Sequence, residues 1–123
     1  MPRISYLLIL LAVLGCSKDK FTCEDNRNAL QQTDTDKVKT FIELHIASLP
    51  SPDYNEANIN QLAASISNEC GFAAAVNCFD CIQTLPSQTE IVVSFNTGGG
   101  TLQRTIDLSY SSSNKIVFRS VHN

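Results

Sequence analysis

The sequence predicts an α+β fold in which two N-terminal helices pack on one face of a three- to four-stranded antiparallel meander sheet. Two observations support this prediction. Between residues 35 and 66 apolar residues recur every three or four positions, which is the period of amphipathic helices. From residue 89 onward apolar and polar residues alternate instead, which is typical of strands with one buried and one solvated face.

The first helix is expected to begin at Asp34 or Thr35, because their side-chain oxygens can cap a helix N-terminus. Pro50 and Pro52 end it, since proline cannot continue a helix. Its predicted apolar face consists of Val38, Phe41, Ile42, His45, Ile46 and Leu49. On this face His45 is expected to be a histidine at the edge of the core.

The second helix is expected to begin near Asp53, because Asp53 and Glu56 have the spacing of a capping box. It should end by Cys70-Gly71, since glycine suits the left-handed conformation found after a helix. Its predicted inner stripe consists of Ile59, Leu62, Ala63 and Ile66. Residues 72–77 are apolar and fit either a buried strand or a last helical turn.

Three further segments alternate as strands, at residues 89–95, 102–110 and 116–121. The glycines of residues 97–100 and the serines of residues 111–114 suit the turns between them. On the first two of these strands, the polar positions define a solvated sheet face that is a possible interaction surface. The residues of this predicted face are Glu90, Gln103, Thr105 and Asp107.

The N-terminus has the pattern of a secretory signal peptide. Arg3 precedes an apolar run from Tyr6 to Leu14, and the small residue Gly15 stands before Cys16. The run is shorter than the roughly 20 residues that a membrane-spanning helix needs. The predicted organisation is a signal peptide at 1–15, a polar, flexible tether at 16–32 and one α+β domain at 33–123.

Two short motifs resemble known lipoprotein signals. Val13-Leu14-Gly15-Cys16 is similar to the bacterial lipobox, whose cysteine is fatty-acylated, as with palmitate, and becomes the first residue. Ser17-Lys18-Asp19 resembles the signal that sends Bacteroidota lipoproteins to the outer face of the outer membrane. The resemblance implies an outer-membrane, surface-exposed protein held by lipid at Cys16, and several acyl chains anchor a protein stably.

A third motif resembles part of a small domain common among Bacteroidota lipoproteins. It runs from Cys78-x-x-Cys81 through Ile82-x-Thr84-Leu85-Pro86 into the strand that begins Glu90-Ile91. The resemblance supports the α+β prediction and implies no activity.

Charge limits the class of partner. Without residues 1–15, which include Arg3, the chain keeps eight Lys and Arg against 12 Asp and Glu, a net charge near −4. A surface of that sign repels phosphate backbones, so we expect no nucleic-acid partner. The sequence shows no motif for a cofactor, and none is expected.

Four cysteines follow Cys16, and an even number in a small exported domain indicates disulfide bonds. They are Cys23, Cys70, Cys78 and Cys81. In an antiparallel helical hairpin, the chain before the first helix lies near the end of the second. This favours the pairs Cys23–Cys70 and Cys78–Cys81 among the three possible pairings.

Three other chemistries are weighed against this structural role. Cys78-x-x-Cys81 could form a redox pair, although only four residues separate it from Pro86, too few for the helix that such motifs open. Zinc could bind Cys70, Cys78 and Cys81 with His45 or His122, although His122 is expected to be mobile and an oxidising compartment disfavours thiolates. We therefore expect no metal site.

Glycan binding is the last alternative, and it depends on exposed aromatic rings. The chain has no Trp, and Tyr54 and Tyr110 are the only rings expected to be exposed. The sequence thus favours a lipid-anchored envelope protein that binds a protein or glycan partner and has no catalytic activity. The alternatives are a thiol–disulfide oxidoreductase and a glycan-binding surface module.

Overall fold

The structure is a computed structural model that describes residues 22–82 and 87–123. Within these ranges the chain forms three helices and one four-stranded antiparallel sheet, which confirms the predicted α+β class. The elements are α2 (Cys23–Gln31), α3 (Thr35–Ala47), α4 (Glu56–Ser67), β1 (Ala73–Ile82), β2 (Gln88–Thr97), β3 (Gly100–Tyr110) and β4 (Ile116–His122). The predicted signal peptide and Cys16 lie outside the described residues.

Helix α2 occupies part of the segment predicted to be a flexible tether, so the folded domain begins earlier than residue 33. A capping box fixes its start, with the Asp25 N–H donating to Thr22 Oγ1 and the Thr22 N–H donating to Asp25 Oδ2. Near its other end, Ala29 and Leu30 are buried in the core. The polar composition of this segment predicted a flexible tether, but a helix this short needs only a few buried residues on one side, and the rest of its surface is polar.

Helix α3 agrees with the prediction. Asp34 is its N-cap and accepts a hydrogen bond from the Lys37 N–H at 3.3 Å. Its buried residues are Val38, Phe41, Ile42 and His45. The helix ends at Ala47, before the two prolines.

Helix α4 begins two residues later than its predicted capping box. Asn55 is the N-cap and accepts from the Asn58 N–H at 2.8 Å. Asp53 instead pairs with Lys115, next to the start of β4. The prediction of an Asp53–Glu56 box is therefore wrong, because a contact distant in sequence claims the Asp53 carboxylate.

The four strands pair in chain order, β1-β2-β3-β4, which is the predicted meander. Residues 72–77 belong mainly to β1, and this strand continues through the Cys78–Cys81 segment. Its pairing with β2 is irregular between Val76 and Cys78 and again between Cys78 and Ile82. Strands β2 and β3 meet at the predicted glycine turn, where Gly100 has a φ of +134°.

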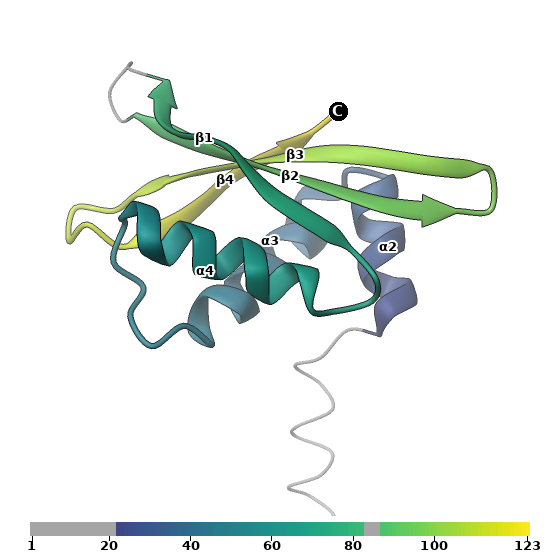
Figure 1. Cartoon of the computed structure of the whole chain (residues 1–123), viewed down its shortest axis with the longest axis horizontal. Helices are drawn as coiled ribbons and strands as arrows, with labels where there is room; N and C mark the ends of the chain where they lie inside the picture. The colour runs from purple at the N-terminus through teal and green to yellow at the C-terminus, as the bar shows by residue number, and fades with distance from the viewer. Residues whose placement is uncertain (1–21, 83–86) are drawn as a thin grey trace, which may run out of the picture.

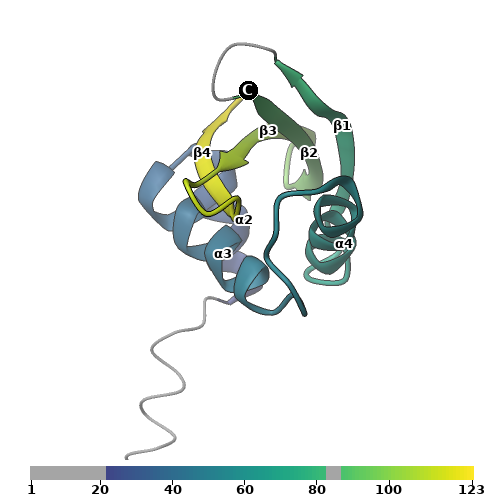
Figure 2. The same cartoon turned by 90° about the vertical axis from the view of Figure 1, so that its left-hand side faces the viewer.

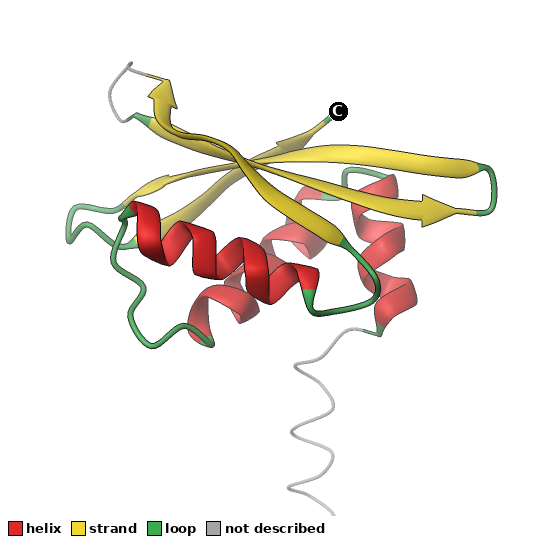
Figure 3. Cartoon of the chain, viewed as in Figure 1, coloured by secondary structure: helices red, strands yellow, loops and turns green. Residues whose placement is uncertain are grey.

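All three helices lie on the same side of the sheet (Figures 1 and 2). The strands in Figure 3 form an upper layer, and the helices form the layer below it. Predicted strand residues such as Ile91, Val93 and Phe95 are at most 3% exposed and meet the helices in one core. Among the described residues, no helix lies over the opposite face of the sheet, which is called the uncovered face below.

Arg104 joins α2 to the sheet. Its neighbour across β2 is Val93, so its side chain lies on the helix-covered face. The guanidinium donates to the main-chain oxygens of Leu30 and Gln31, each at 2.9 Å. These carbonyls end α2 and lack partners within the helix, so Arg104 satisfies them while it holds the helix in place.

Candidate functional site

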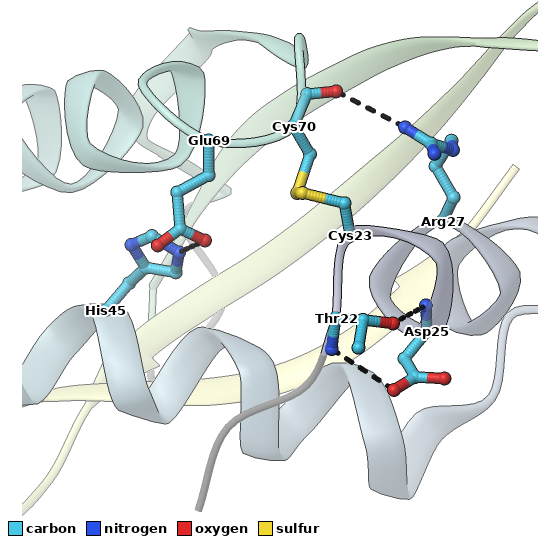
Figure 4. The surroundings of a disulfide bond; sticks show 7 residues. All are labelled: Thr22, Cys23, Asp25, Arg27, His45, Glu69 and Cys70. Atoms are coloured by element: carbon cyan, nitrogen blue, oxygen red, sulfur yellow. Dashed lines mark hydrogen bonds and ion pairs between the residues drawn. A yellow bond between two sulfur atoms is a disulfide. The ribbon is translucent and has the colours of Figure 1, made fainter. Parts of the chain in front are cut away.

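Both predicted disulfides are present in the structure. Cys23 at the start of α2 is bonded to Cys70 after α4, with their Cα atoms 5.2 Å apart (Figure 4). Arg27 also donates to the Cys70 main-chain oxygen at 3.4 Å. The disulfide joins the first described helix to the last, so its role in this region is structural.

The second disulfide, Cys78–Cys81, closes the irregular segment of the edge strand β1. A redox motif is normally placed at a helix N-terminus, where backbone N–H groups stabilise the thiolate. Here both cysteines lie within a strand and are only partly exposed. The alternative zinc set of Cys70, Cys78 and Cys81 has no support either, because all three of its sulfurs are in disulfides.

Tyr54 and Tyr110 are not exposed rings, which corrects the prediction for a glycan platform. Tyr54 is only 8% exposed, and its ring centroid lies 5.1 Å from that of Tyr110 and 5.4 Å from that of Phe79. The Tyr54 hydroxyl is 2.7 Å from Thr89 Oγ1 and 3.3 Å from Asp80 Oδ1. Burial raises the pKa of Tyr54, and the Asp80 carboxylate raises it further.

His45 occupies the core edge, as predicted. It is 7% exposed, and its ring nitrogens lie 2.7 Å from Ser65 Oγ and 3.1 Å from Glu69 Oε2. The histidine therefore joins α3 to the end of α4, near the Cys23–Cys70 disulfide (Figure 4). Both of its nitrogens are engaged in this structural contact.

The predicted interaction face is the uncovered face of the sheet, over which none of the described helices lies. Glu90 lies directly opposite Asp107 in the β2–β3 register, while Thr105 and Gln103 follow along the same face. Gln103 is exposed, and Glu90 and Thr105 are half-buried. Asp107 departs from the prediction of a solvated residue, because it is only 7% exposed.

Asp107 is buried because β4 lies against it. Its Oδ2 accepts from Ser120 Oγ at 2.6 Å and lies 3.0 Å from His122 Nε2. Within the described residues, its other oxygen, Oδ1, is buried without a hydrogen-bond partner. The expectation that His122 is mobile is therefore wrong, because this residue lies in β4 and contacts Asp107.

Glu90, Asp107 and His122 form the most chemically distinctive cluster on this face. Each offers one nitrogen or oxygen, and these three atoms lie within 4.8 Å of one another. Glu90 Oε1 also accepts from Asn77 Nδ2 at 3.0 Å. Two carboxylates and an imidazole in this arrangement can hold a cation or a cationic side chain.

The alternation of polar residues predicted Glu90 and Asp107 on this face, but it did not predict His122 and Ser120 as their neighbours. Strand β4 reaches them through an irregular register, in which Asp107 pairs with Ser120 and Leu108 with Phe118. The extra residue, Arg119, forms a bulge that strand alternation alone does not reveal. The only sequence feature that pointed to these neighbours is the pair of polar residues after the bulge in β4, Ser120 and His122.

No known protein family, no curated protein and no solved structure matches the chain. None of the helices in residues 22–82 and 87–123 is long and apolar enough to cross a membrane.

Proposed function

We propose that the protein is a lipid-anchored module of the outer membrane that binds an envelope protein through the uncovered face of its sheet and performs no catalysis. The observation that carries this proposal is that face itself. It carries the half-buried Glu90 opposite the buried Asp107 and the exposed Gln103 beyond them, whereas the nearby Arg104 side chain extends from the other face. A basic segment of a partner protein is the chemistry that fits it.

The anchor is proposed from the sequence motif at Cys16. Six residue steps separate Cys16 from Thr22, and a fully extended chain of that length spans at most about 22 Å. Because α2 begins at Cys23, the lipid would hold the domain much closer to the membrane than a tether ending at residue 32 would.

The position of α2 also suggests an orientation. Its first turn lies on the helix side of the sheet, away from the uncovered face (Figure 1). A lipid attached shortly before this turn favours a domain with its helices toward the membrane. The uncovered face would then be directed outward, where a partner can reach it.

The anchor is tested with Cys16→Ser, expressed in a bacterium that processes lipoproteins. We expect the native protein to incorporate labelled palmitate and to sediment with membranes. The variant should incorporate none and appear in the soluble fraction. Equal membrane association of the two proteins would overturn the anchoring at Cys16.

The interface is tested by crosslinking intact envelopes and comparing the captured proteins. Glu90→Lys with Gln103→Lys raises the net charge of the uncovered face by three units, and Asp107 is left intact because it is buried. Glu43→Lys with Gln61→Lys makes the same charge change at exposed positions on α3 and α4. A specific crosslinked partner should disappear only with the first pair, and its retention would refute this interface.

A further inference from the structure

We propose that Glu90, Asp107 and His122 form a binding site for a divalent transition-metal ion such as Zn²⁺. Strands β2, β3 and β4 each supply one ligand, so the site lies across the uncovered face of the sheet. This inference depends on the described geometry and not on the proposed anchor; a bound ion and a basic partner segment would compete for the same two carboxylates.

The distances are close to those of a metal site. Zn²⁺ is bound by imidazole and carboxylate at about 2.0–2.2 Å, which places tetrahedral ligand atoms about 3.4 Å apart. The three candidate atoms already lie within 4.8 Å of one another, and His122 Nε2 is 3.0 Å from Asp107 Oδ2. The difference between this 4.8 Å bound and the tetrahedral spacing is about 1.4 Å, which a rotation of the half-buried Glu90 side chain would close.

The charge of the cluster favours a cation. Glu90 and Asp107 are directly opposite each other, and like charges at such positions destabilise a sheet. Among the described residues, neither carboxylate has an ion pair with lysine or arginine. A divalent ion between them would turn this repulsion into attraction.

Asp107 supplies the second, independent observation. Its side chain is buried among the three strands, yet its Oδ1 has no hydrogen-bond partner in the described part of the chain. Buried polar atoms are normally satisfied, and an orphaned carboxylate oxygen indicates a missing ion or donor. A metal ion bound through both oxygens of this carboxylate would satisfy Oδ1 as well as meet Oδ2, the oxygen near His122 Nε2.

His122 has the arrangement of a ligating histidine. Its Nδ1 lies 3.1 Å from the main-chain oxygen of Asn123, and its Nε2 is directed at Asp107. Ligating histidines commonly donate one ring N–H to an oxygen and bind the metal through the other nitrogen. In the tautomer whose Nδ1–H donates to Asn123, the Nε2 lone pair beside Asp107 is free to bind a metal ion.

The ligand set also selects the class of metal. Imidazole suits Zn²⁺, Co²⁺ or Ni²⁺, whereas Ca²⁺ and Mg²⁺ prefer sites made only of oxygen. Three protein ligands leave a fourth tetrahedral position open to water or to a side chain of another molecule.

The test measures binding of ZnCl₂ and CoCl₂ to the chelator-treated, purified full chain, by calorimetry and by the visible spectrum of bound Co²⁺. We expect one ion per chain and a tetrahedral Co²⁺ spectrum. Glu90→Gln and His122→Gln remove ligands from half-buried and exposed positions, so both variants should fold. Each should weaken binding roughly 100-fold or more, since even second-shell changes cost 10- to 100-fold.

Two matched variants separate this site from other surface groups. Glu43→Gln removes an exposed glutamate from α3, and Glu69→Gln removes the glutamate that contacts His45. Both should bind Zn²⁺ as the native protein does. Failure of the native chain to bind, or loss of binding in Glu69→Gln with retention in His122→Gln, would overturn the proposal.

A spectroscopic readout identifies the ligand atom directly. Zn²⁺ should shift the NMR signal of His122 Nε2 and leave that of His45 unchanged. The interface can be tested separately with Gln103→Lys alone, because Gln103 is not a proposed ligand. Loss of crosslinking without loss of Zn²⁺ binding would distinguish the two sites.

Discussion

The two disulfides should contribute very different amounts of stability, and the difference follows from the length of chain that each one closes. Cys23–Cys70 spans a sequence separation of 47, whereas Cys78–Cys81 spans 3. On the chain-entropy model, a closed loop of that greater length restricts the unfolded state by about 4 kcal/mol, and the short loop by about 1.5 kcal/mol. Replacing the first pair should therefore lower the free energy of unfolding by about 2.5 kcal/mol more than replacing the second.

The contacts around each disulfide point the same way. The other contacts of helix α2 that are buried or hydrogen-bonded to the sheet lie mostly near its C-terminal end, at Ala29, Leu30 and the carbonyls that accept from Arg104, while the buried Asn26 and the Arg27 hydrogen bond to Cys70 lie before them. Loss of Cys23–Cys70 should release the first turn of α2. The Cys78–Cys81 segment, in contrast, remains attached through the pairing of β1 with β2.

The assay is urea unfolding of Cys23→Ser with Cys70→Ser against Cys78→Ser with Cys81→Ser. With a urea m-value of roughly 1–3 kcal/mol/M, a loss of 4 kcal/mol lowers the midpoint by about 1–4 M. Hydrogen exchange should speed up in residues 23–27 of the first variant only. Equal midpoints for the two variants, or a lower midpoint for the second, would refute the reasoning.

Three further predictions concern single side chains. Ile91→Ala should lower the free energy of unfolding by about 2–5 kcal/mol, because the side chain is fully buried at the centre of the sheet; a loss below 1 kcal/mol in denaturant unfolding would contradict this. Arg104→Met should lower it by roughly 1.5–3 kcal/mol and increase hydrogen exchange in α2, while the exposed Arg119→Met should change neither. The pKa of Tyr54 is raised on folding, so the contribution of its protonated hydroxyl to the free energy of unfolding is complete below about pH 10 and is lost as the pH rises further. Tyr54→Phe should therefore lose less stability at alkaline pH than the native chain. Identical dependence of stability on pH in the two proteins would show that the buried Tyr54 hydroxyl does not cause the alkaline loss.

The elements that the sequence predicted well are those in which local pattern and burial agree. Ile91, Val93 and Phe95 alternate in the sequence and all face the helices, because strand geometry places every second side chain on one face. The α3 face and its Asp34 cap were predicted for the same reason, since both depend on residues within four positions. The Cys23–Cys70 pair was inferred from the helical hairpin, although α2 itself was missed.

The predictions that were wrong concern residues whose contacts are distant in sequence. Asp53 looked like a helix cap but pairs with Lys115, and Tyr54 looked exposed but lies beneath Phe79 and Tyr110. In both cases the local sequence allowed the prediction, and a neighbour more than twenty residues away decided the outcome.

The sequence alone determined the class of fold, the helix-covered face of the sheet and the cysteines available for disulfides, because these follow from side-chain period and residue type. Only the tertiary structure decided that Asp107 is buried and that His122 lies beside it. The bulge at Arg119 sets which β4 residues meet β3, and such a register depends on how whole strands pair. Each of the three strands was predicted from its own sequence, but the candidate metal site exists only because they are aligned in that register.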